Sequence, residues 1–289
     1  AASDRDVTFV EADHDHYATV AERVRTVLRD HAGEIEVASI DEAYADLSHL
    51  DGYGAARDVA ETVQREIRGR EGLTASVGIG PNKLVAKMAS DRDKPGGMTV
   101  VEPDEVAAFL GDLPVEDLHG VGPKTAGELA AMDVETVADL RDVPAQRLVR
   151  EFGEARGMAL YTTARGEGST DLAESEQKQL SRITTLAADT DRMGDLRPVI
   201  RDLAGDVMDR VTARNWMYST VTAICITSDR DTRTRSRSFK TASGDRERFF
   251  RTAEDLVATF LDEEDAALRR VGVRAAGFDT GGQQTLGDF

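Results

Sequence analysis

The stretch Ser39-Ile40-Asp41-Glu42-Ala43-Tyr44-Ala45-Asp46 decides the fold of this 289-residue chain. It follows a strand-like run at 34–40 and returns as a second strand. Two adjacent carboxylates on a regular strand point to opposite faces, but at a strand end entering a tight turn they can converge. Mg²⁺ prefers hard oxygen ligands, usually one or two carboxylates together with substrate phosphates. The pattern therefore predicts a metal site at Asp41 and Glu42, or else an ordinary acidic turn on the surface.

Apolar spacing on both sides of this stretch predicts further helices and strands. A helix is expected before it and a second helix after it, followed by a strand, a short helix and a last strand. This order favours an α+β sheet domain. The expected segments are helices at 17–32, 54–68 and 82–90, and strands at 73–80 and 96–101.

The motif S-I-D-E-A-Y-x-D resembles the palm motif of Y-family translesion DNA polymerases of the DinB (DNA polymerase IV) type. Residues 74–101, T-A-S-V-G-I-G-P-N-K-L-V-A-K-M-A-S-D-R-D-K-P-G-G-M-T-V-V, are similar to the second palm block of that family. The resemblance implies a ferredoxin-like palm in which Asp41 and Glu42 bind two Mg²⁺ ions. It also implies that Lys94 contacts the nucleoside triphosphate. Lys83 and Lys87 lie on the predicted short helix and could face phosphate too.

A second motif, Leu118-His119-Gly120-Val121-Gly122-Pro123-Lys124, resembles a helix-hairpin-helix. Its glycines let backbone N–H groups point outward at a helix N-terminus, which is a ready anion site. Lys124 adds positive charge, so the motif predicts contact with a DNA phosphate and no reading of bases. The DNA-contacting residues predicted here are Gly120, Val121, Gly122 and Lys124.

A basic run stands out in an acidic chain. Residues 230–251 carry eight bases and three acids, whereas the whole chain has a net charge of −18. Arg233, Arg235 and Arg237 alternate, so one face of a strand is expected to present three guanidinium groups. We expect these arginines and Lys240 to bind DNA phosphates. In the resembled family this strand belongs to the little-finger domain.

The last residues, Gln283-Gln284-Thr285-Leu286-Gly287-Asp288-Phe289, have the pattern Q-x-x-L-x-x-F. This pattern resembles the peptide by which archaeal and eukaryotic replication proteins bind a sliding clamp of the PCNA type. Leu286 and Phe289 fall on one side of a single helical turn and can fill an apolar pocket, with Gln283 beside it.

The motifs divide the chain into an N-terminal partial palm, a helical thumb, a polar linker, an α+β little finger and a clamp-binding tail. The corresponding ranges are 1–111, 112–165, 166–177, 178–278 and 279–289. In residues 178–278 the sequence predicts the order strand, helix, strand, strand, helix, strand. We expect a monomer that binds primer–template DNA, deoxynucleoside triphosphate and the clamp.

The charge balance at first argues against nucleic acid, because 54 acids face 36 bases and phosphates would be repelled. The other interpretation is that the acidic surface is that of a halophile's protein. In molar salt the Debye length is about 3 Å, so local clusters of charge matter more for binding than the net charge does. The apolar runs are too short for a membrane helix. The single cysteine, Cys225, excludes an internal disulfide. We expect a cytoplasmic protein.

Members of the resembled family begin with a D-x-D-x-F-F-like strand and a small fingers domain, neither of which matches the start of this sequence. The resemblance implies that this strand carries a further catalytic aspartate. We therefore expect the 289-residue chain alone to polymerise poorly or not at all. The alternatives are a non-catalytic DNA- and clamp-binding module and, less favoured, a helix-hairpin-helix nuclease. An in-frame D-x-D-x-F-F block upstream would decide for the enzyme.

Overall fold

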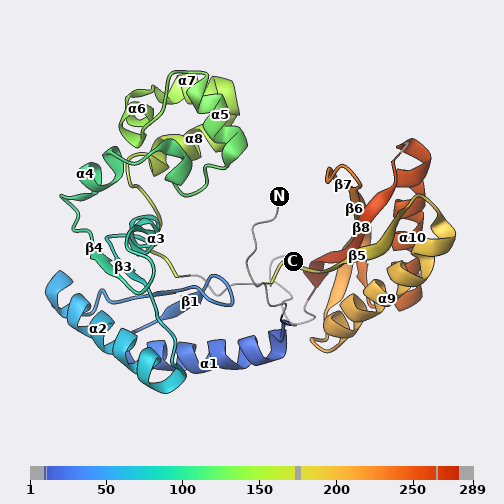
Figure 1. The fold of residues 1–289 in the computed structure, drawn as a ribbon, viewed down its shortest axis with the longest axis horizontal. Helices are drawn as coiled ribbons and strands as arrows, with labels where there is room; N and C mark the ends of the chain where they lie inside the picture. The colour runs from blue at the N-terminus through green and yellow to red at the C-terminus, as the bar shows by residue number, and fades with distance from the viewer. Residues whose placement is uncertain (1–9, 11, 173–176, 265, 280–289) are drawn as a thin grey trace, which may run out of the picture. The chain divides into compact units, whose positions relative to one another are not determined.

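The computed structural model describes residues 10, 12–172, 177–264 and 266–279 of the protein. They form two compact units, Ala1–Ser175 and Glu176–Phe289, each with its own hydrophobic core (Figure 1). Both units combine helices and strands, so the predicted α+β multidomain fold is confirmed. None of the helices in these ranges is long and apolar enough to cross a membrane.

The first unit combines short strands with helices α1 to α8. The chain order is α1 (His14–His31), β1 (Ile35–Val37), β2 (Ala43–Ala45), α2 (Gly52–Glu71), β3 (Val77–Ile79), α3 (Lys83–Arg92), β4 (Met98–Val100), α4 (Val106–Gly111), the 3-10 helix η1 (Val115–Asp117), α5 (Pro123–Ala130), α6 (Val137–Asp142), α7 (Ala145–Phe152) and α8 (Glu154–Thr163).

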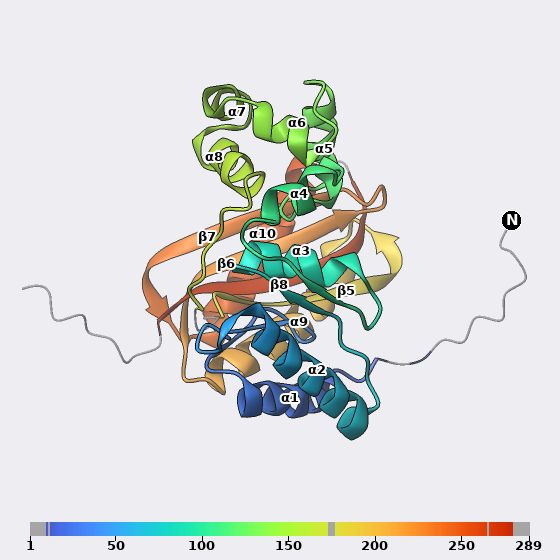
Figure 2. The same ribbon diagram turned by 90° about the vertical axis from the view of Figure 1, so that its left-hand side faces the viewer.

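The strands of this unit pair locally. β1 and β2 form an antiparallel hairpin, and β3 and β4 form a parallel pair connected by α3. Within the described ranges the two pairs are separate two-stranded sheets rather than one ferredoxin-like sheet. Helices α1 and α2 lie side by side (Figures 1 and 2), with Val27 of α1 packed against Val63 and Ile67 of α2. The hairpin is thus connected to a helix at each end.

Helix α3 lies close against β3 at Gly78. A Cβ atom at this position would collide with the backbone of Ala86 and of Ser90. Glycine is therefore required here by space, because no side-chain movement could relieve a clash with backbone atoms. The contact fixes α3 against the parallel strand pair.

Replacing Gly78 by alanine is expected to lower the free energy of unfolding of the first unit by about 1–3 kcal/mol, as for an overpacked core. Gly69→Ala in α2 is the matched control, because a Cβ there meets nothing within 4 Å. Chemical denaturation followed by circular dichroism measures the effect. Fluorescence of Trp216, the one tryptophan of the sequence, reports the second unit and should not shift. Equal stability of the two variants would contradict the packing argument.

Helix α3 and the helices α4 to α8 share one hydrophobic core. Val85 and Met88 of α3 belong to the same buried cluster as Leu110, Leu129 and Leu148. The last helix of the predicted palm and the predicted thumb are therefore packed around common side chains. Figure 2 shows α4 to α8 gathered at one end of this unit.

The second unit has the predicted order strand, helix, strand, strand, helix, strand. Its four-stranded antiparallel sheet has the strand order β5-β8-β6-β7. Helices α9 and α10 cover one face of this sheet (Figure 1), and Tyr218, Phe249 and Phe260 are fully buried between the layers. The elements are β5 (Gln179–Thr190), α9 (Met193–Thr212), β6 (Met217–Thr227), β7 (Thr232–Ser243), α10 (Arg246–Glu263) and β8 (Leu268–Asp279).

Residues of β6 alternate between the two faces of the sheet. Val221, Ala223 and Cys225 are buried in the core under the helices. Burial raises the pKa of the Cys225 thiol to about 12. This cysteine is therefore a small apolar core residue and is protonated at neutral pH.

Candidate functional site

The turn between β1 and β2 carries the two candidate carboxylates. The backbone N–H groups of Ala38 and Ser39 both donate to the carbonyl oxygen of Glu42, at 3.0 and 3.1 Å. The backbone therefore reverses within residues 38–42, and Asp41 lies in the turn rather than on a regular strand. Both acidic side chains are exposed at this end of the hairpin.

Asp41 is held in its charged form. The hydroxyl of Ser39 donates to Oδ1 of Asp41 at 2.6 Å. This hydrogen bond lowers the pKa of Asp41, and the positive charges of Lys87 and Lys94 lower it further. The carboxylate is consequently ionised at neutral pH, which is the form that can bind a cation or accept a hydrogen bond.

Helix α3 turns two lysines toward the hairpin. They are four residues apart and therefore lie on one face of the helix. Nζ of Lys83 is 2.8 Å from Oε2 of Glu36, and Nζ of Lys87 is 2.5 Å from Oε1 of Glu42. Asn82 caps the N-terminus of this helix, since its side chain accepts from the N–H of Val85.

Lys94 joins the same group of charges through Asp91. Oδ1 of Asp91 lies 2.5 Å from Nζ of Lys94 and 3.5 Å from Nζ of Lys87. Burial of Lys87 opposes its charged form, but its hydrogen bond to Glu42 and the charges of both acids outweigh this and raise its pKa. The structure thus brings the candidate carboxylates and the three predicted phosphate-facing lysines into one neighbourhood.

The donor chemistry of the turn fits a divalent cation whose other ligands come from a substrate. Asp41 and Glu42 contribute carboxylate oxygens, and Mg²⁺ commonly binds one or two carboxylates plus phosphates and water. No cluster of three or more His, Cys, Asp or Glu side chains suited to a metal occurs among the described residues. The turn therefore supplies part of a coordination shell.

The helix-hairpin-helix motif lies at the start of α5. Gly120 has φ +89°, a left-handed conformation that favours glycine, and Gly122 is the N-cap of α5. No side chain hydrogen-bonds at this cap. The Lys124 side chain is 84% exposed, and Val121 is buried in the core. Nζ of Lys124 lies 3.8 Å from Oε1 of Glu128, so this exposed ammonium group already has an acidic neighbour on the same helix.

The alternating arginines of β7 do lie on one face, and that face is the one the helices cover. Arg233 is paired with Cys225, whose side chain is in the core, and Arg235 and Arg237 are paired with Ala223 and Val221. The three guanidinium groups also have acidic neighbours. The ion pairs are Arg233–Asp231 (2.6 Å), Arg235–Glu263 (2.8 Å), Arg235–Glu264 (3.4 Å) and Arg237–Asp255 (3.3 Å). Lys240 is exposed.

The opposite face of the sheet, which we call the helix-free face, carries two arginines that the sequence patterns did not single out. Arg274 is paired with Thr222, and Arg270 with Ile226. Both alternate with the buried residues of β8, so their side chains leave the sheet on the side away from α9 and α10. The Nε atom of Arg274 is buried and has no hydrogen-bond partner among the described residues. The alternation in L-R-R-V-G-V-R at 268–274 is the signal that could have found them.

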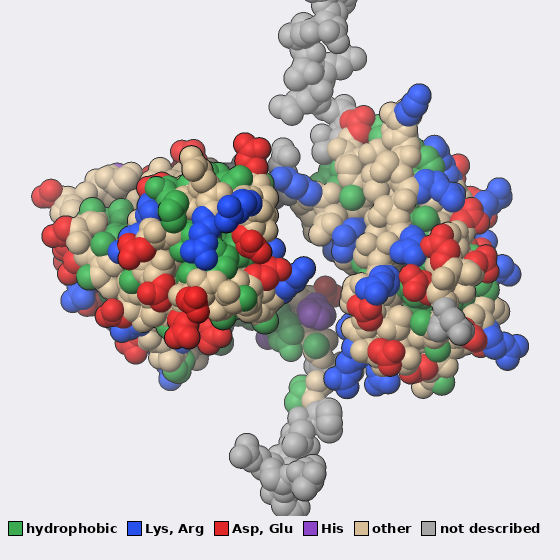
Figure 3. Space-filling view, turned by 90° about the horizontal axis from the view of Figure 1, so that it is seen from above, with side chains coloured by type: hydrophobic (Ala, Val, Ile, Leu, Met, Phe, Trp, Pro, Cys, Tyr) green, Lys and Arg blue, Asp and Glu red, His purple; other side chains and the backbone are tan. Residues whose placement is uncertain are grey.

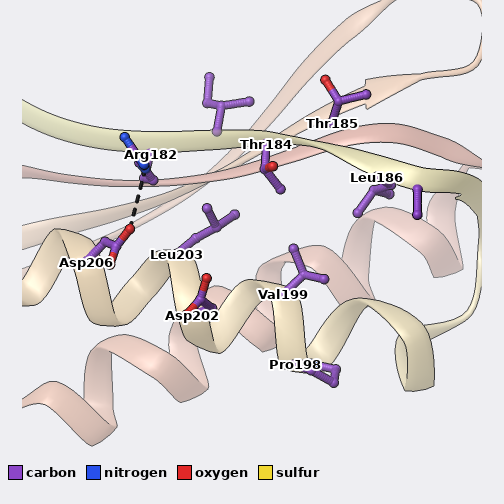
Figure 4. Close-up of a pocket in the computed structure, with 11 residues that line it drawn as sticks. Arg182, Thr184, Thr185, Leu186, Pro198, Val199, Asp202, Leu203 and Asp206 are labelled. Carbon is purple, nitrogen blue, oxygen red and sulfur yellow. Dashed lines mark ion pairs between the residues drawn. The ribbon is translucent and has the colours of Figure 1, made fainter. Parts of the chain in front are cut away.

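A hollow of 510 Å³ lies in the second unit between β5 and α9 (Figure 4). Apolar side chains such as Leu186, Val199 and Leu203 line it, and an ion pair of 3.4 Å between Arg182 and Asp206 lies at one end. None of the predicted site residues lines this hollow. On the face that Figure 3 shows, acidic and basic side chains are interspersed over each unit. Gln283, Leu286 and Phe289 lie outside the described residues.

Known proteins match this sequence along most of its length. Residues 2–91 match the model of the impB/mucB/samB family, and residues 177–287 match its C-terminal domain. Residues 116–167 match the thumb domain of DNA polymerase-iota. DNA polymerase IV of Methanosarcina acetivorans is 36% identical over 294 residues, which cover 98% of this chain and 80% of that protein. The chain belongs to the DinB group of Y-family DNA polymerases.

Further relatives agree with this membership of the Y family. DNA polymerase IV of Methanoculleus marisnigri is 38% identical over 94% of this chain and 75% of its own length. Among solved structures, a Y-family DNA polymerase chimera of Dbh and Dpo4 has a TM-score of 0.86 at 27% identity. It covers 94% of this chain, which in turn covers 79% of the chimera. An insertion ternary complex of Dbh DNA polymerase has a TM-score of 0.62 at 27% identity, with 93% and 78% covered. The Y-family fold inferred from the motifs is confirmed.

Proposed function

We propose that this chain performs template-directed nucleotidyl transfer of the lesion-bypass type, with Asp41 and Glu42 at the reacting phosphates. The observation that carries the proposal is the convergence of these carboxylates with Lys83, Lys87 and Lys94, in a chain of the DinB group. In this reaction the primer 3′-oxygen bonds to the α-phosphorus and pyrophosphate leaves. Lysines near the turn would neutralise the charge of the triphosphate.

Y-family polymerases use divalent metal ions, and we propose two Mg²⁺ ions with Asp41 and Glu42 among their ligands. Such ions stabilise negative charge that develops on the attacking and leaving oxygens. The protein's own contribution is to keep Asp41 ionised through Ser39 and to hold Glu42 at the end of the turn. Lys94 and Lys87 would contact the phosphates of the nucleotide.

We further propose two contacts with primer–template DNA. The first turn of α5, with Gly120 to Lys124, would bind a backbone phosphate through N–H groups. The helix-free face, with Arg270 and Arg274, would bind further phosphates. Because Arg233 and Arg237 leave the sheet on the opposite face, they would join this contact, with Lys240, only around the edge strand β7. Exposed ion pairs are weak, so phosphate can compete with Asp231 and Asp255 for these arginines. We propose a monomer that works in the cytoplasm.

Primer extension tests the function. A polymerase that contains this chain together with the D-x-D-x-F-F-like strand of the family is incubated with Mg²⁺, the four deoxynucleotides and a primer annealed to an undamaged template or to one with an abasic site. Incorporation directed by the template, and continuation past the lesion, supports the proposal. Tight DNA binding with no incorporation would instead favour the non-catalytic DNA- and clamp-binding module.

Deleting residues 283–289 is expected to leave distributive synthesis within about twofold of the starting rate and to remove stimulation by a PCNA-type clamp. The reason is that Leu286 and Phe289 would supply the apolar anchors of a helical peptide in a groove. Product length on a long template, with and without clamp, measures this. Thr285→Ala is the matched control, because it lies between the anchor positions. Undiminished stimulation of the deletion variant would remove the clamp assignment.

A further inference from the structure

The segment after α8 is held against the N-terminus of α3. Gly166 is buried, with φ +72°, and a Cβ atom there would collide with Val106 of α4. Two hydrogen bonds then hold the following residues: the side-chain Nδ2 of Asn82 donates to the carbonyl oxygen of Gly166 at 2.8 Å, and the N–H of Lys83 donates to the carbonyl oxygen of Ser169 at 3.2 Å. We call residues 166–169 the strap.

The side-chain amide of Asn82 makes one hydrogen bond through its oxygen and another through its nitrogen. Its Oδ1 accepts from the N–H of Val85 at 3.0 Å and so caps α3, while its Nδ2 holds Gly166. The fit around it is close, because a Cβ atom on Gly168 would lie 3.0 Å from Oδ1 of Asn82 and 3.0 Å from Cβ of Leu84. An aspartate could cap the helix equally well, but it could not donate to the strap.

The helix that Asn82 caps is the one that places lysines at the candidate active site. Lys83 follows Asn82 directly and reaches Glu36, and Lys87 lies one turn later and reaches Glu42. The ammonium position of each lysine therefore depends on how the first turn of α3 is seated. Among the described residues that follow α8, only those of the strap hydrogen-bond to this turn.

We propose that Asn82 is a positioning residue for nucleotide binding: through Nδ2 it keeps the strap seated on α3, and the seated strap holds Lys83 and Lys87 at the turn that carries Asp41 and Glu42. This inference rests on the proposed function, because it assigns those lysines to the triphosphate. The strap leads into the segment that connects the two units, so the same amide couples that segment to the nucleotide site.

The test is Asn82→Asp in the full-length protein, which keeps the cap acceptor and replaces the donor facing Gly166 by a second acceptor. The KM for the incoming nucleotide is expected to rise about 2- to 13-fold, the value of one lost hydrogen bond, while kcat stays within about twofold. The affinity for a fluorescent nucleotide should fall by the same factor. Hydrogen exchange at residues 167–172 should become faster, and the melting temperature should change by less than about 3 °C.

A second variant reaches the strap without changing α3. Gly168→Ala inserts a methyl group against Asn82 and Leu84, and it should reproduce the raised KM and the faster exchange. The matched control is Asp245→Asn, an exchange between aspartate and asparagine at the N-cap of a different helix, α10. There Oδ1 of Asp245 accepts from the N–H of Arg248 at 3.1 Å. This control should leave nucleotide binding unchanged.

The possible outcomes separate this inference from the proposed function. Faster exchange of the strap with unaltered nucleotide affinity in Asn82→Asp would overturn the positioning role, and so would a loss of kcat with unaltered KM. A wild-type protein that binds nucleotide but adds none to a primer would overturn catalysis, while the change in affinity still tests Asn82. A wild-type protein that binds no nucleotide overturns both.

Discussion

Replacing Asp41 by asparagine, or Glu42 by glutamine, is expected to lower kcat for primer extension by about 10²- to 10³-fold in a catalytically active polymerase that contains this chain. Both changes keep the size of the side chain and remove a carboxylate charge. Metal-assisted stabilisation of the transition state contributes several kcal/mol, and each 1.36 kcal/mol is a factor of about ten in rate. Single-turnover extension with saturating nucleotide measures the effect.

Two further measurements make this test specific. The dissociation constant for primer–template DNA should stay within about twofold, and binding of Mn²⁺, followed by electron paramagnetic resonance, should weaken. Asp46→Asn is the matched control, because Asp46 lies in the same motif and its Oδ1 accepts from the N–H of Ser48, a bond that asparagine can keep. Equal losses of DNA binding and of extension would contradict a role confined to the reacting phosphates.

Replacing both Arg270 and Arg274 by glutamine is expected to weaken DNA binding about 10²- to 10⁴-fold, equally for all sequences. A charge-assisted hydrogen bond contributes about 1.5–3 kcal/mol, and these two arginines have no acidic partner among the described residues, so the effect should be large. The slope of log K against log salt should fall by roughly one unit per lost phosphate contact. Fluorescence anisotropy over a series of salt concentrations measures both quantities.

The arginines of β7 provide the comparison. Arg235 and Arg237 already pair with Glu263 and Asp255, so their replacement by glutamine should cost less than about tenfold, because phosphate must first displace these acids. Arg251→Gln is the control, since its side chain is 73% exposed and pairs with Glu247 on the same helix. A larger loss from the β7 pair than from the β8 pair would reverse the assignment of the two faces.

The order of elements could be predicted from sequence because it rests on local patterns. The apolar spacing at 17–32 and 54–68 predicted two helices, and the second unit has the predicted strand and helix order. The turn at Asp41 was also local, since Ala38, Ser39 and Glu42 close it with their own backbone. Helix spacing likewise predicted that Lys83 and Lys87 share a face.

Long-range pairing decided what the sequence left open. Alternation showed that Arg233, Arg235 and Arg237 share a face, but only the register with β6 shows that this is the face under α10. The run 232–238 contains no large apolar residue whose burial would have indicated the side. In β8 such a signal exists, because Val271 and Val273 mark the buried face. The hydrogen bond from Asn82 to Gly166 joins positions 84 residues apart, so no local sequence pattern could have predicted it.

The core that α3 shares with the helices α4 to α8 limits how this polymerase can be recombined with its relatives. A chimera that exchanges residues 112–165 alone would set foreign side chains against Val85, Met88 and Leu110, which pack in one cluster with Leu129 and Leu148. A graft that begins before α3 and ends after the strap carries both sides of that packing. In a functional chimera, α3 and the helices α4 to α8 should therefore come from the same parent protein. The polar stretch that follows the strap is a better place to join two parents.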